Sequence, residues 1–479
     1  MVWRLIERWL GAFPLGHKVI AYVSSQGVPA YMVGGTVRDA LLRRQTTDLD
    51  IAVESGAMSM ARRVADRIGG AYVPLDLGRD VARVVVRVGG EQYHFDFAGL
   101  RAQEIEGDLR ARDYTVNAMA VRLGTGPSGL IDPAEGRADL DARVLRVTGK
   151  DVFKDDPLRI LRGLRLSGEL GFTLTSDSES LAREHLGELR RVSAERVRDE
   201  LARVLSLDNS ADTLAYASAL GALPVILPEF RDGGALLRRS IGVVSRLEEL
   251  LGQWTRRASA VEVAPKAAVE SELGRYRGLL AWHWGEELSV GRPRWLALKL
   301  AALLSPVPHG PAVACAVARR LRFSTQEVRF VSAAIQAANQ CLEWAGKVEP
   351  ERVQIYRHYR RLGSAGMDGA ILSLAAYAPA TENREIGDTW TRLLRCVRRL
   401  LGAWFDERDA LVDPPRLLSG RDLVRAFALA PGRQVGQLLE MLREAQVEEL
   451  VRTRDQAIEF VRARVAGSQK DAQGPHSQG

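Results

Sequence analysis

Two aspartates one residue apart, Asp48 and Asp50, follow a glycine pair in the stretch YMVGGTVRDALLRRQTTDLDIAV, which begins at Tyr31. The segment DLDIAV has the composition of a short strand, on which residues two apart point to the same side. Adjacent carboxylates repel each other unless a cation neutralises them, and such hard oxygen ligands suit Mg²⁺ bound together with substrate phosphates. A DxD pair alone is more often a solvated turn or strand end, but its position after a glycine pair and a helix favours the metal-binding interpretation.

The glycine pair Gly34 and Gly35 lies between an expected strand, residues 30–33, and an expected helix that begins with TVRDALL. Glycine lets the backbone approach an anion closely, and the start of the following helix aims free N–H groups at it. Arg38, one turn into this helix, has a guanidinium that could reach the same anion. The combination predicts a pocket for phosphates beside the two carboxylates.

A third acid is expected nearby, since two metal ions a few ångströms apart need more than two protein ligands. The stretch VARVVVRVGGEQYHFDFAGLR contains two alternating strands joined by a glycine-pair turn signal. On the second strand Asp96 is flanked by two phenylalanines, which alternate onto the opposite face. We therefore expect Asp96 to complete the acidic site. The alternative is an exposed acid that solubilises an edge strand.

The apolar pattern changes along the chain and defines the elements that would position these acids. Up to about residue 145 short apolar runs alternate with helical patterns, as in a mixed sheet with helices packed on it. Beyond this point apolar residues recur at three- and four-residue spacing, with few strand signals. The sequence thus predicts an α+β protein with an N-terminal head and an all-α remainder. Pro- and Gly-containing breaks give the expected segments 1–145 (head), 146–230 (neck), 231–412 (body), 413–465 (tail) and 466–479 (disordered).

These motifs together resemble the nucleotidyltransferases of the polymerase-β superfamily, and within it the class II CCA-adding tRNA nucleotidyltransferases and their bacterial poly(A) polymerase relatives. GGTVRD followed by DLD is similar to the first motif of that family, ARDYTVNAMA to the second, and DDPLRILRGLRLSGELGF to the nucleotide-selecting motif. LIDPAEGRADLDARVLR is similar to the segment that joins head and neck, and SAERVRDEL to the neck-helix motif. Order and spacing agree through about residue 205.

The resemblance implies an enzyme that adds C, A or both to the 3′ acceptor end of tRNA from CTP and ATP, with release of pyrophosphate. It implies that Mg²⁺ is held by Asp48, Asp50 and Asp96, and that Asp113 lies near the sugar 2′-hydroxyl. The RNA 3′-hydroxyl would attack the α-phosphorus, helped by positioning and charge stabilisation. The residues that would bind the nucleotide are Gly34, Gly35, Arg38, Arg112, Asp113, Asp156, Arg159, Arg162 and Arg165.

The nucleotide-selecting residues have a physical logic of their own. On a single helix Asp156 and Arg159 are neighbours one turn apart, while Arg162 and Arg165 wind away and are left to hold phosphates or primer. Cytosine and adenine both present an exocyclic amine beside a ring-nitrogen acceptor, so an aspartate next to an arginine could accept C and A and reject U and G. The alternative is an ordinary ladder of i,i+3 ion pairs.

Two positions depart from the family pattern: Asp155 stands where relatives mostly carry Glu, and Ala111 replaces a second arginine before Arg112. The segment WLALKLAALLSPVPHGPA resembles the signature of a metal-dependent HD phosphohydrolase domain, but Ser305 and Pro306 stand in place of the His–Asp dyad. No HD pair occurs in the sequence. We therefore expect a degenerate body domain without hydrolase activity, in which His309 is incidental.

A formal net charge of +7 favours a polyanionic partner. The alternative is that Arg-rich helices are simply well solvated. Phosphate contacts to RNA would be expected from two groups of residues in the body, Tyr356, Arg357, Tyr359, Arg360 and Arg361, and Arg392, Arg395 and Arg399.

Three scattered cysteines without CxxC spacing indicate neither a disulfide framework nor a zinc site, which fits a reducing cytoplasm. The sequence offers no apolar run of membrane-spanning length, and the start MVWRLIERWLGAF is typical of an amphipathic helix of the mature protein. We expect a cytoplasmic protein without a membrane partner.

Several functions share these motifs. Enzymes that add only CC or only the final A share all of them, and a poly(A) polymerase shares nearly all. A catalytically silent RNA-binding protein on the same scaffold is the alternative from another class. The intact acids argue against silence, because a scaffold without catalysis has no reason to keep carboxylates packed together.

Overall fold

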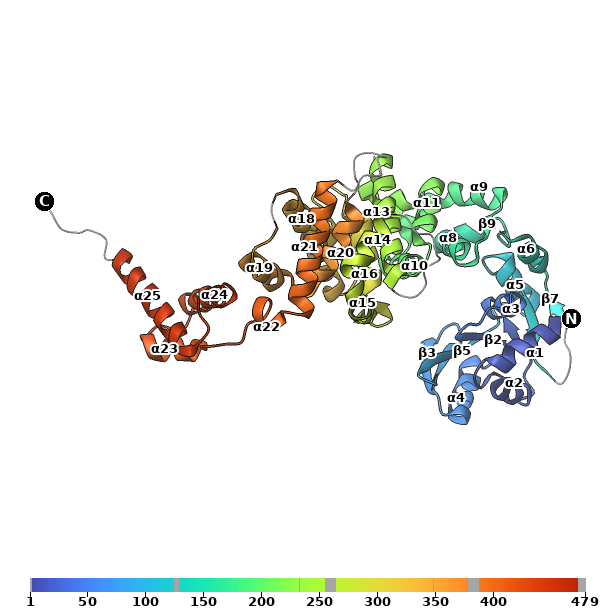
Figure 1. Ribbon diagram of the computed structural model, residues 1–479. Coiled ribbons are helices and arrows are strands. Elements are labelled where there is room, and N and C mark those ends of the chain that lie inside the picture. Colours follow the sequence, from blue (N-terminus) through green and yellow to red (C-terminus); the bar gives the residue numbers. More distant parts are fainter. Residues whose placement is uncertain are drawn as a thin grey trace. The chain divides into compact units, whose positions relative to one another are not determined.

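A computed structural model describes residues 2–124, 129–231, 233–254, 264–347, 349–377 and 387–472. The chain divides into two compact units (Figure 1). The first comprises residues 1–207 and 212–231, and the second comprises residues 208–211 and 232–479. The main division, between Arg231 and Asp232, falls in the stretch PEFRDGGALL, where Pro and Gly cluster.

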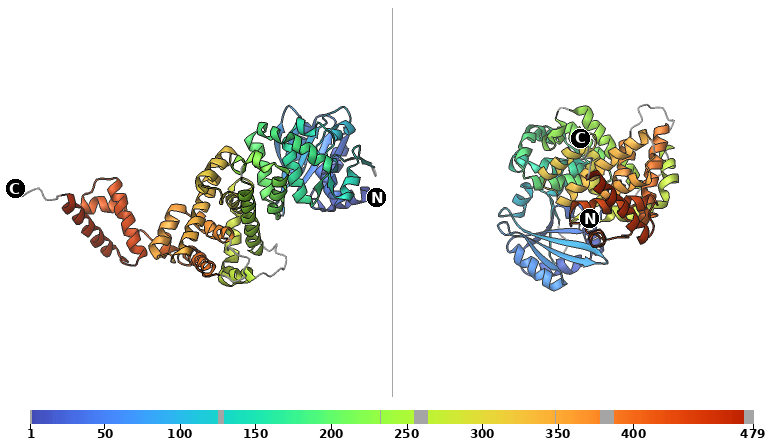
Figure 2. Two further views of the ribbon diagram at one scale, coloured as in Figure 1. Left: turned by 90° about the horizontal axis from the view of Figure 1, so that it is seen from above. Right: turned by 90° about the vertical axis from the view of Figure 1, so that its left-hand side faces the viewer.

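A seven-stranded sheet is the framework of the first unit, with the order β3-β4-β5-β2-β1-β6-β7 (blue strands in Figure 2). β2 and β5 pair in parallel, and the other neighbouring pairs are antiparallel. The mixed sheet expected from the sequence is confirmed. Its strands are β1 (Ala30–Val33), β2 (Asp48–Val53), β3 (Ala71–Asp76), β4 (Val81–Val88), β5 (Glu91–Gly99), β6 (Ala120–Arg122) and β7 (Leu130–Ile131).

Helices cover both faces of this sheet. On one face Phe95 of β5 is fully buried and meets the Phe13 ring edge-on, and α4 packs on β4 and β5. On the other face Ile105 and Leu109 of α5 cluster with Ala52 of β2. The helices of this region are α1 (Val2–Ala12), α2 (Gly16–Ser24), α3 (Gly35–Leu41), α4 (Ala57–Ile68) and α5 (Ile105–Arg110), followed by the short 3-10 helix η1 (Thr115–Asn117).

The neck follows the sheet and is mainly helical. A close approach joins it to the head: a Cβ added at Gly163 of α8 would lie 1.9 Å from the Tyr114 hydroxyl, which donates to the Arg159 carbonyl at 2.8 Å. Any larger residue at position 163 would push α8 away from the head. The elements are α6 (Gly136–Ala142), β8 (Val144–Leu145), α7 (Val152–Asp155), α8 (Leu158–Leu170), β9 (Thr173–Leu174), α9 (Ser176–His185), η2 (Leu186–Arg191), α10 (Ala194–Leu205), α11 (Ser210–Leu220), α12 (Leu223–Ile226) and η3 (Pro228–Phe230).

The described residues of the second unit form helices, apart from the short hairpin β10 (Glu287–Ser289) and β11 (Arg292–Pro293). α18 and α20 pack closely at its centre, where a Cβ added at Gly369 would lie 2.3 Å from the Ala334 carbonyl. Its first helices are α13 (Gly234–Trp254), α14 (Ala264–Leu273), η4 (Gly274–Tyr276), α15 (Arg277–Gly285), α16 (Arg294–Leu304), α17 (Gly310–Arg320), α18 (Thr325–Gly346), α19 (Arg352–Leu362), α20 (Ala365–Ala376), α21 (Asp388–Phe405) and α22 (Arg408–Leu411).

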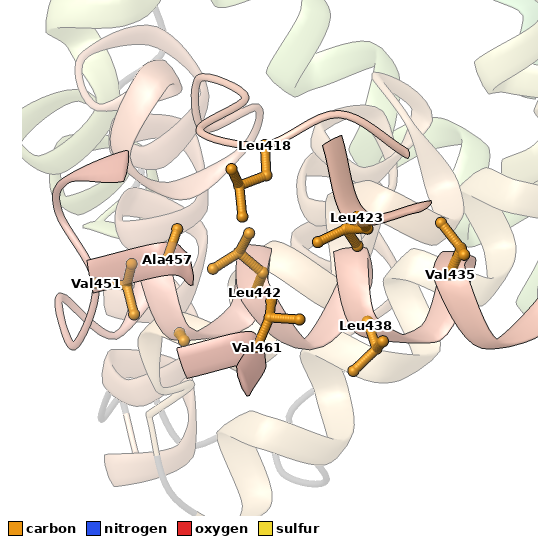
Figure 3. Packing of buried hydrophobic residues seen from close by; sticks show 9 residues of the cluster. Leu418, Leu423, Val435, Leu438, Leu442, Val451, Ala457 and Val461 are labelled. Carbon is orange, nitrogen blue, oxygen red and sulfur yellow. The ribbon is translucent and has the colours of Figure 1, made fainter. Parts of the chain in front are cut away.

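The last three helices have an apolar core of their own (Figure 3). They are α23 (Gly420–Phe427), α24 (Arg433–Val447) and α25 (Arg454–Ala472), and Leu423, Leu442 and Val461 lie at the centre of the core. α25 continues past residue 466, where we expected disorder to begin, while residues 473–479 lie outside the described residues. None of the described helices combines the length and apolarity needed to cross a membrane.

Candidate functional site

Three acids lie on one face of the sheet. Parallel pairing of β2 with β5 places Asp50 beside Asp96 and Asp48 beside His94. The two phenylalanines that flank Asp96 are buried on the opposite face. Burial, reinforced by the Asp96 carboxylate, raises the pKa of Asp50 to about 6. The sheet register therefore brings together the three acids singled out in the sequence, and their charges are close enough to oppose one another.

Two of the acids have protein partners. The Asp96 carboxylate accepts hydrogen bonds from Arg83 Nε and Nη2, both at 2.7 Å. Asp48 Oδ1 lies 2.8 Å from His94 Nδ1. In this arrangement no group of three or more His, Cys, Asp or Glu side chains in the described residues could hold a metal ion. The carboxylates have the donor chemistry that Mg²⁺ requires and lie close to one another, but an arginine holds one of them.

The glycine turn lies directly against the acids. Gly34 has a φ of +67°, and a Cβ added there would lie 2.8 Å from Arg112 Nη1 and 3.5 Å from Asp50 Oδ2. α3 begins at Gly35, and the Thr36 hydroxyl accepts a 2.8 Å hydrogen bond from the Asp50 backbone N–H. The turn and the acidic strand are thus fixed to each other. The contribution of Thr36 could not be predicted, because a hydroxyl that accepts from a neighbouring strand leaves no local pattern in the sequence.

Arg112 and Arg162 bring positive charge to the acids. Each guanidinium lowers the pKa of Asp50 and so offsets part of the increase caused by burial, because both lie within electrostatic reach of Asp50. Arg112 is held by Asp108, which accepts from its Nε and Nη2 at 3.3 and 3.1 Å. Arg162 Nε lies 2.9 Å from Asp113 Oδ2. Although burial acts in the opposite direction, Arg162 and the Tyr114 N–H hold the pKa of Asp113 below its usual value.

Arg38 lies beside the turn, but its guanidinium donates hydrogen bonds to other side chains of the protein. Its side chain is buried; Nε and Nη2 donate to Asp39 at 3.0 and 2.9 Å, and Nη1 donates to Asn117 Oδ1 at 2.7 Å. Asn117 in turn donates to Asp113 at 3.3 Å. Arg38 thus links the first motif to the second, and its contact with phosphate stays a prediction.

The expectation that Asp156 and Arg159 lie one turn apart on one helix is wrong. Asp156 precedes Pro157, which disfavours a helical conformation at the preceding residue, and its backbone is extended (φ −151°, ψ 98°). α8 begins only at Leu158. The Asp156 carboxylate accepts from Arg196 Nη1 and Nη2 of α10 at 3.2 and 2.7 Å, whereas Arg159 Nη2 donates to the Ala111 carbonyl at 3.1 Å.

Arg196 was missed by the sequence reasoning, although it lies in the quoted stretch SAERVRDEL. Its partner Asp156 is 40 residues away along the chain, and no local spacing indicates such a pair. Arg165, by contrast, pairs with Glu169 at 2.5 Å and with Glu200 of α10 at 2.9 Å. The ion-pair interpretation therefore describes Arg165, which fastens α8 to α10.

Most of the basic residues expected to touch RNA are engaged within the second unit. Arg357 donates to Glu444 through Nε and Nη2, both at 2.6 Å, and the Tyr356 hydroxyl donates to Glu440 at 2.8 Å. Tyr359 is buried and donates to a backbone carbonyl. The other partners are Glu440 for Arg360, Gln340 for Arg361, the Ala345 carbonyl for Arg392, Glu349 for Arg395 and Glu407 for Arg399. These side chains fasten helices to one another.

The body has no metal-binding group among the described residues. Ser305 caps the C-terminal end of α16, and His309 precedes α17 with a left-handed backbone. The buried Asp368 accepts from Trp284 Nε1 and Arg294 Nε, at 3.1 and 2.9 Å. The absence of hydrolase activity in the body stays a prediction.

Comparison with known proteins places these features in a family. Residues 30–146 match the family described as poly A polymerase head domain, and residues 171–233 match the probable RNA and SrmB-binding site of polymerase A. The CC-adding tRNA nucleotidyltransferase of Geobacter sulfurreducens is 33% identical over 450 residues, which cover 94% of this chain and 95% of the relative. The A-adding tRNA nucleotidyltransferase of Deinococcus radiodurans is 32% identical over 441 residues, which cover 90% and 94%.

The fold also matches solved structures. The structure described as a CCA-adding enzyme in complex with CTP has a TM-score of 0.64 and 21% identity, with 96% of this chain and 98% of that one covered. This likeness extends over head, neck, body and tail. Together with the relatives, and with the three acids beside a glycine turn, it shows that the chain belongs to the tRNA nucleotidyltransferase family of the CCA-adding enzymes.

Proposed function

We propose that the protein transfers CMP, AMP or both from CTP and ATP to the 3′ end of tRNA and releases pyrophosphate. The observation that carries this proposal is the row of Asp48, Asp50 and Asp96 with the Gly34 turn against Asp50. The CC-adding and A-adding relatives support it, since each aligns with at least nine tenths of the chain.

The three acids would hold Mg²⁺, which when bound lowers the pKa of the attacking hydroxyl and neutralises the triphosphate. The fit rests on the crowding of the carboxylates, because the raised pKa of Asp50 indicates a site that gains from a cation. Asp48 lies two residues before Asp50 on β2, and Asp96 is the register partner of Asp50 on β5.

The chain's own residues would bind and orient the nucleotide. The positive φ of Gly34 brings the backbone close to Asp50 and to Arg112, at a position where a Cβ would meet the Arg112 guanidinium. Arg112 lies at this turn and would neutralise phosphate charge, and Gly35 opens α3 beside it. Asp113, held by Arg162 and Asn117, would lie near the ribose.

Base selection would use Asp156 and Arg159, although the two residues do not lie one turn apart on a single helix. Asp156 is held in an extended segment before α8 by the forked contact from Arg196, and Arg159 extends from the first turn of α8. A carboxylate oxygen has more than one lone pair, so Asp156 could accept from the exocyclic amine of C or A while Arg196 still holds it. Arg159 would then supply the donor for the ring nitrogen.

We also propose that the protein acts in the cytoplasm. The free thiols Cys315, Cys341 and Cys396 are compatible with a reducing compartment.

The experiment is an addition assay with three tRNA transcripts, which end before CCA, after C, or after CC. Each would be incubated with the protein, Mg²⁺ and one nucleoside triphosphate at a time, and the products separated at single-nucleotide resolution. Addition of one or two C residues, of a final A, or of both supports the proposal and identifies the step. Long A tails would identify a poly(A) polymerase, and the absence of addition to all three would identify a silent RNA-binding protein.

A further inference from the structure

Arg83 is a cation already present among the three acids. It lies on β4 directly opposite Asp96 of β5, which is in turn the register partner of Asp50 on β2. Cross-strand partners share a face of the sheet, so Arg83, Asp96 and Asp50 form a row across three strands. The guanidinium fork donates to both Asp96 oxygens at 2.7 Å.

Arg83 also interacts electrostatically with Asp48 and Asp50. The hydrogen bonds that Arg83 donates to Asp96, and the negative charges of Asp96, Asp48 and Asp50, all raise the pKa of Arg83. Its side chain is about one third exposed, 34%, against 23% for that of Asp96, so the pair lies at the edge of the site and can open without unpacking the core. A bidentate arginine occupies a lone pair on each Asp96 oxygen, and its positive charge opposes the approach of a metal ion to the same carboxylate.

We propose that Arg83 is a built-in counter-ion of the acidic site, which holds Asp96 while no metal is bound and competes with the divalent cation for its oxygens. This inference rests on the proposed function, because it assumes that the three acids bind metal. The acids share a face of the sheet, yet no group of three acids among the described residues is arranged to hold a metal ion. The engagement of Asp96 by Arg83 accounts for this difference.

Two consequences follow from this competition. Without metal, Arg83 screens three carboxylates and so stabilises the head domain. When a cation binds, Asp96 must exchange the guanidinium for the metal, and the released Arg83 then faces the site as an unengaged phosphate donor. Arg83 is therefore a positioning residue that sets the affinity of the site for metal.

The test compares Arg83→Gln with Arg87→Gln. Arg87 is exposed on the same face of β4, four residues further along, so its substitution removes the same charge from the same strand without touching Asp96. Binding of Mn²⁺ alone to the full chain would be measured by the electron paramagnetic resonance signal of free Mn²⁺. Thermal unfolding would be followed in the metal-free protein and with Mn²⁺ or Mg²⁺.

We expect Arg83→Gln to bind Mn²⁺ more tightly, on the order of tenfold, because its competitor is gone. The same variant should unfold at a lower temperature without metal and gain more from added metal than the unsubstituted protein. Arg87→Gln should leave both properties unchanged. With Asp96→Asn as background, Arg83→Gln should tighten binding much less, which would show that most of the effect acts through this pair.

Equal or weaker Mn²⁺ binding by Arg83→Gln than by the unsubstituted protein would overturn the counter-ion role, while the proposed function would stand. An unsubstituted protein that binds no Mn²⁺ would overturn both. If Arg83→Gln does not fold, Arg83→Lys keeps the charge but loses the fork, and should still bind Mn²⁺ more tightly than the unsubstituted protein. Unchanged affinity in Arg83→Lys would then count against the proposal.

Discussion

Asp50 and Asp96 are register partners on the parallel strands β2 and β5, and burial, reinforced by the neighbouring Asp96 carboxylate, raises the pKa of Asp50 to about 6. An acid whose pKa is higher in the folded than in the unfolded state stabilises the fold below its unfolded pKa. That stability is lost as the pH rises through the folded pKa. The metal-free head should therefore lose stability between about pH 4 and pH 6 through this group.

Asp50→Asn should remove this loss. Without metal, the variant should be about 2 kcal/mol more stable than the unsubstituted protein at pH 7.5 and similar to it near pH 4. Chemical unfolding at several pH values, with chelator present, measures the difference. Asp48→Asn is the matched control, since Asp48 lies on the same strand with a half-exposed side chain and should show a much smaller effect. Equal stability of Asp50→Asn and the unsubstituted protein at pH 7.5 would contradict the crowding of charges.

Gly34→Ala should damage the site more than the fold. The added Cβ would lie 2.8 Å from Arg112 Nη1 at a backbone conformation that only glycine adopts easily, which costs about 1–3 kcal/mol. Gly89→Ala is the control, since Gly89 has a similar φ of +62° and no described heavy atom lies within 4 Å of an added Cβ. The two variants should lose similar stability, but only Gly34→Ala should lose nucleotide addition. Similar addition rates in the two would place the nucleotide elsewhere.

Arg196→Ala should loosen base selection. Without the two donors from α10, the Asp156 carboxylate loses its fixed orientation, so discrimination against UTP and GTP should fall by about tenfold, with a smaller change for the correct nucleotide. Competing single-nucleotide additions to one tRNA transcript measure this ratio. Arg191→Ala, which removes an exposed arginine paired only locally with Glu188, should leave it unchanged. An unaltered ratio in Arg196→Ala would remove Asp156 from base selection.

Arg357→Gln should leave tRNA binding and its dependence on salt unchanged, because Glu444 already engages the guanidinium. The partly exposed pair should contribute no more than about 1 kcal/mol to stability. Tyr356→Phe should lower the free energy of unfolding by about 1 kcal/mol, since it removes the hydrogen bond that the hydroxyl of this buried residue donates to Glu440. Filter binding across a range of salt concentrations, with unfolding curves, tests both statements. A shallower salt dependence in Arg357→Gln would restore this residue as an RNA contact.

The acidic site could be predicted because its signals are local. Period-two alternation puts Asp48 with Asp50 and separates Asp96 from its flanking phenylalanines, and the register of β2 with β5 then brings the three together. The roles of Arg83, Thr36 and Arg196 could not be predicted, because each depends on a contact with a residue on another element.

The prediction that Asp156 lies on the same helix as Arg159 is wrong for a reason that is visible in the local sequence. Pro157 was in the sequence, and a residue before proline avoids the helical conformation, so Asp156 should have been placed before the helix and not on it. Arg38 is a different case. Its spacing from the glycine pair suits a phosphate contact, which stays a prediction, while its buried side chain donates to Asp39 and Asn117.

The measurement that bears most directly on the acidic site is the single-turnover rate of nucleotide addition to a tRNA transcript without CCA by Asp96→Asn, with retained folding checked by circular dichroism. If Asp96 shares the metal with Asp48 and Asp50, the rate should fall by at least about a hundredfold while the unfolding temperature changes little. A folded Asp96→Asn protein that adds nucleotides at the unsubstituted rate would contradict the three-acid site.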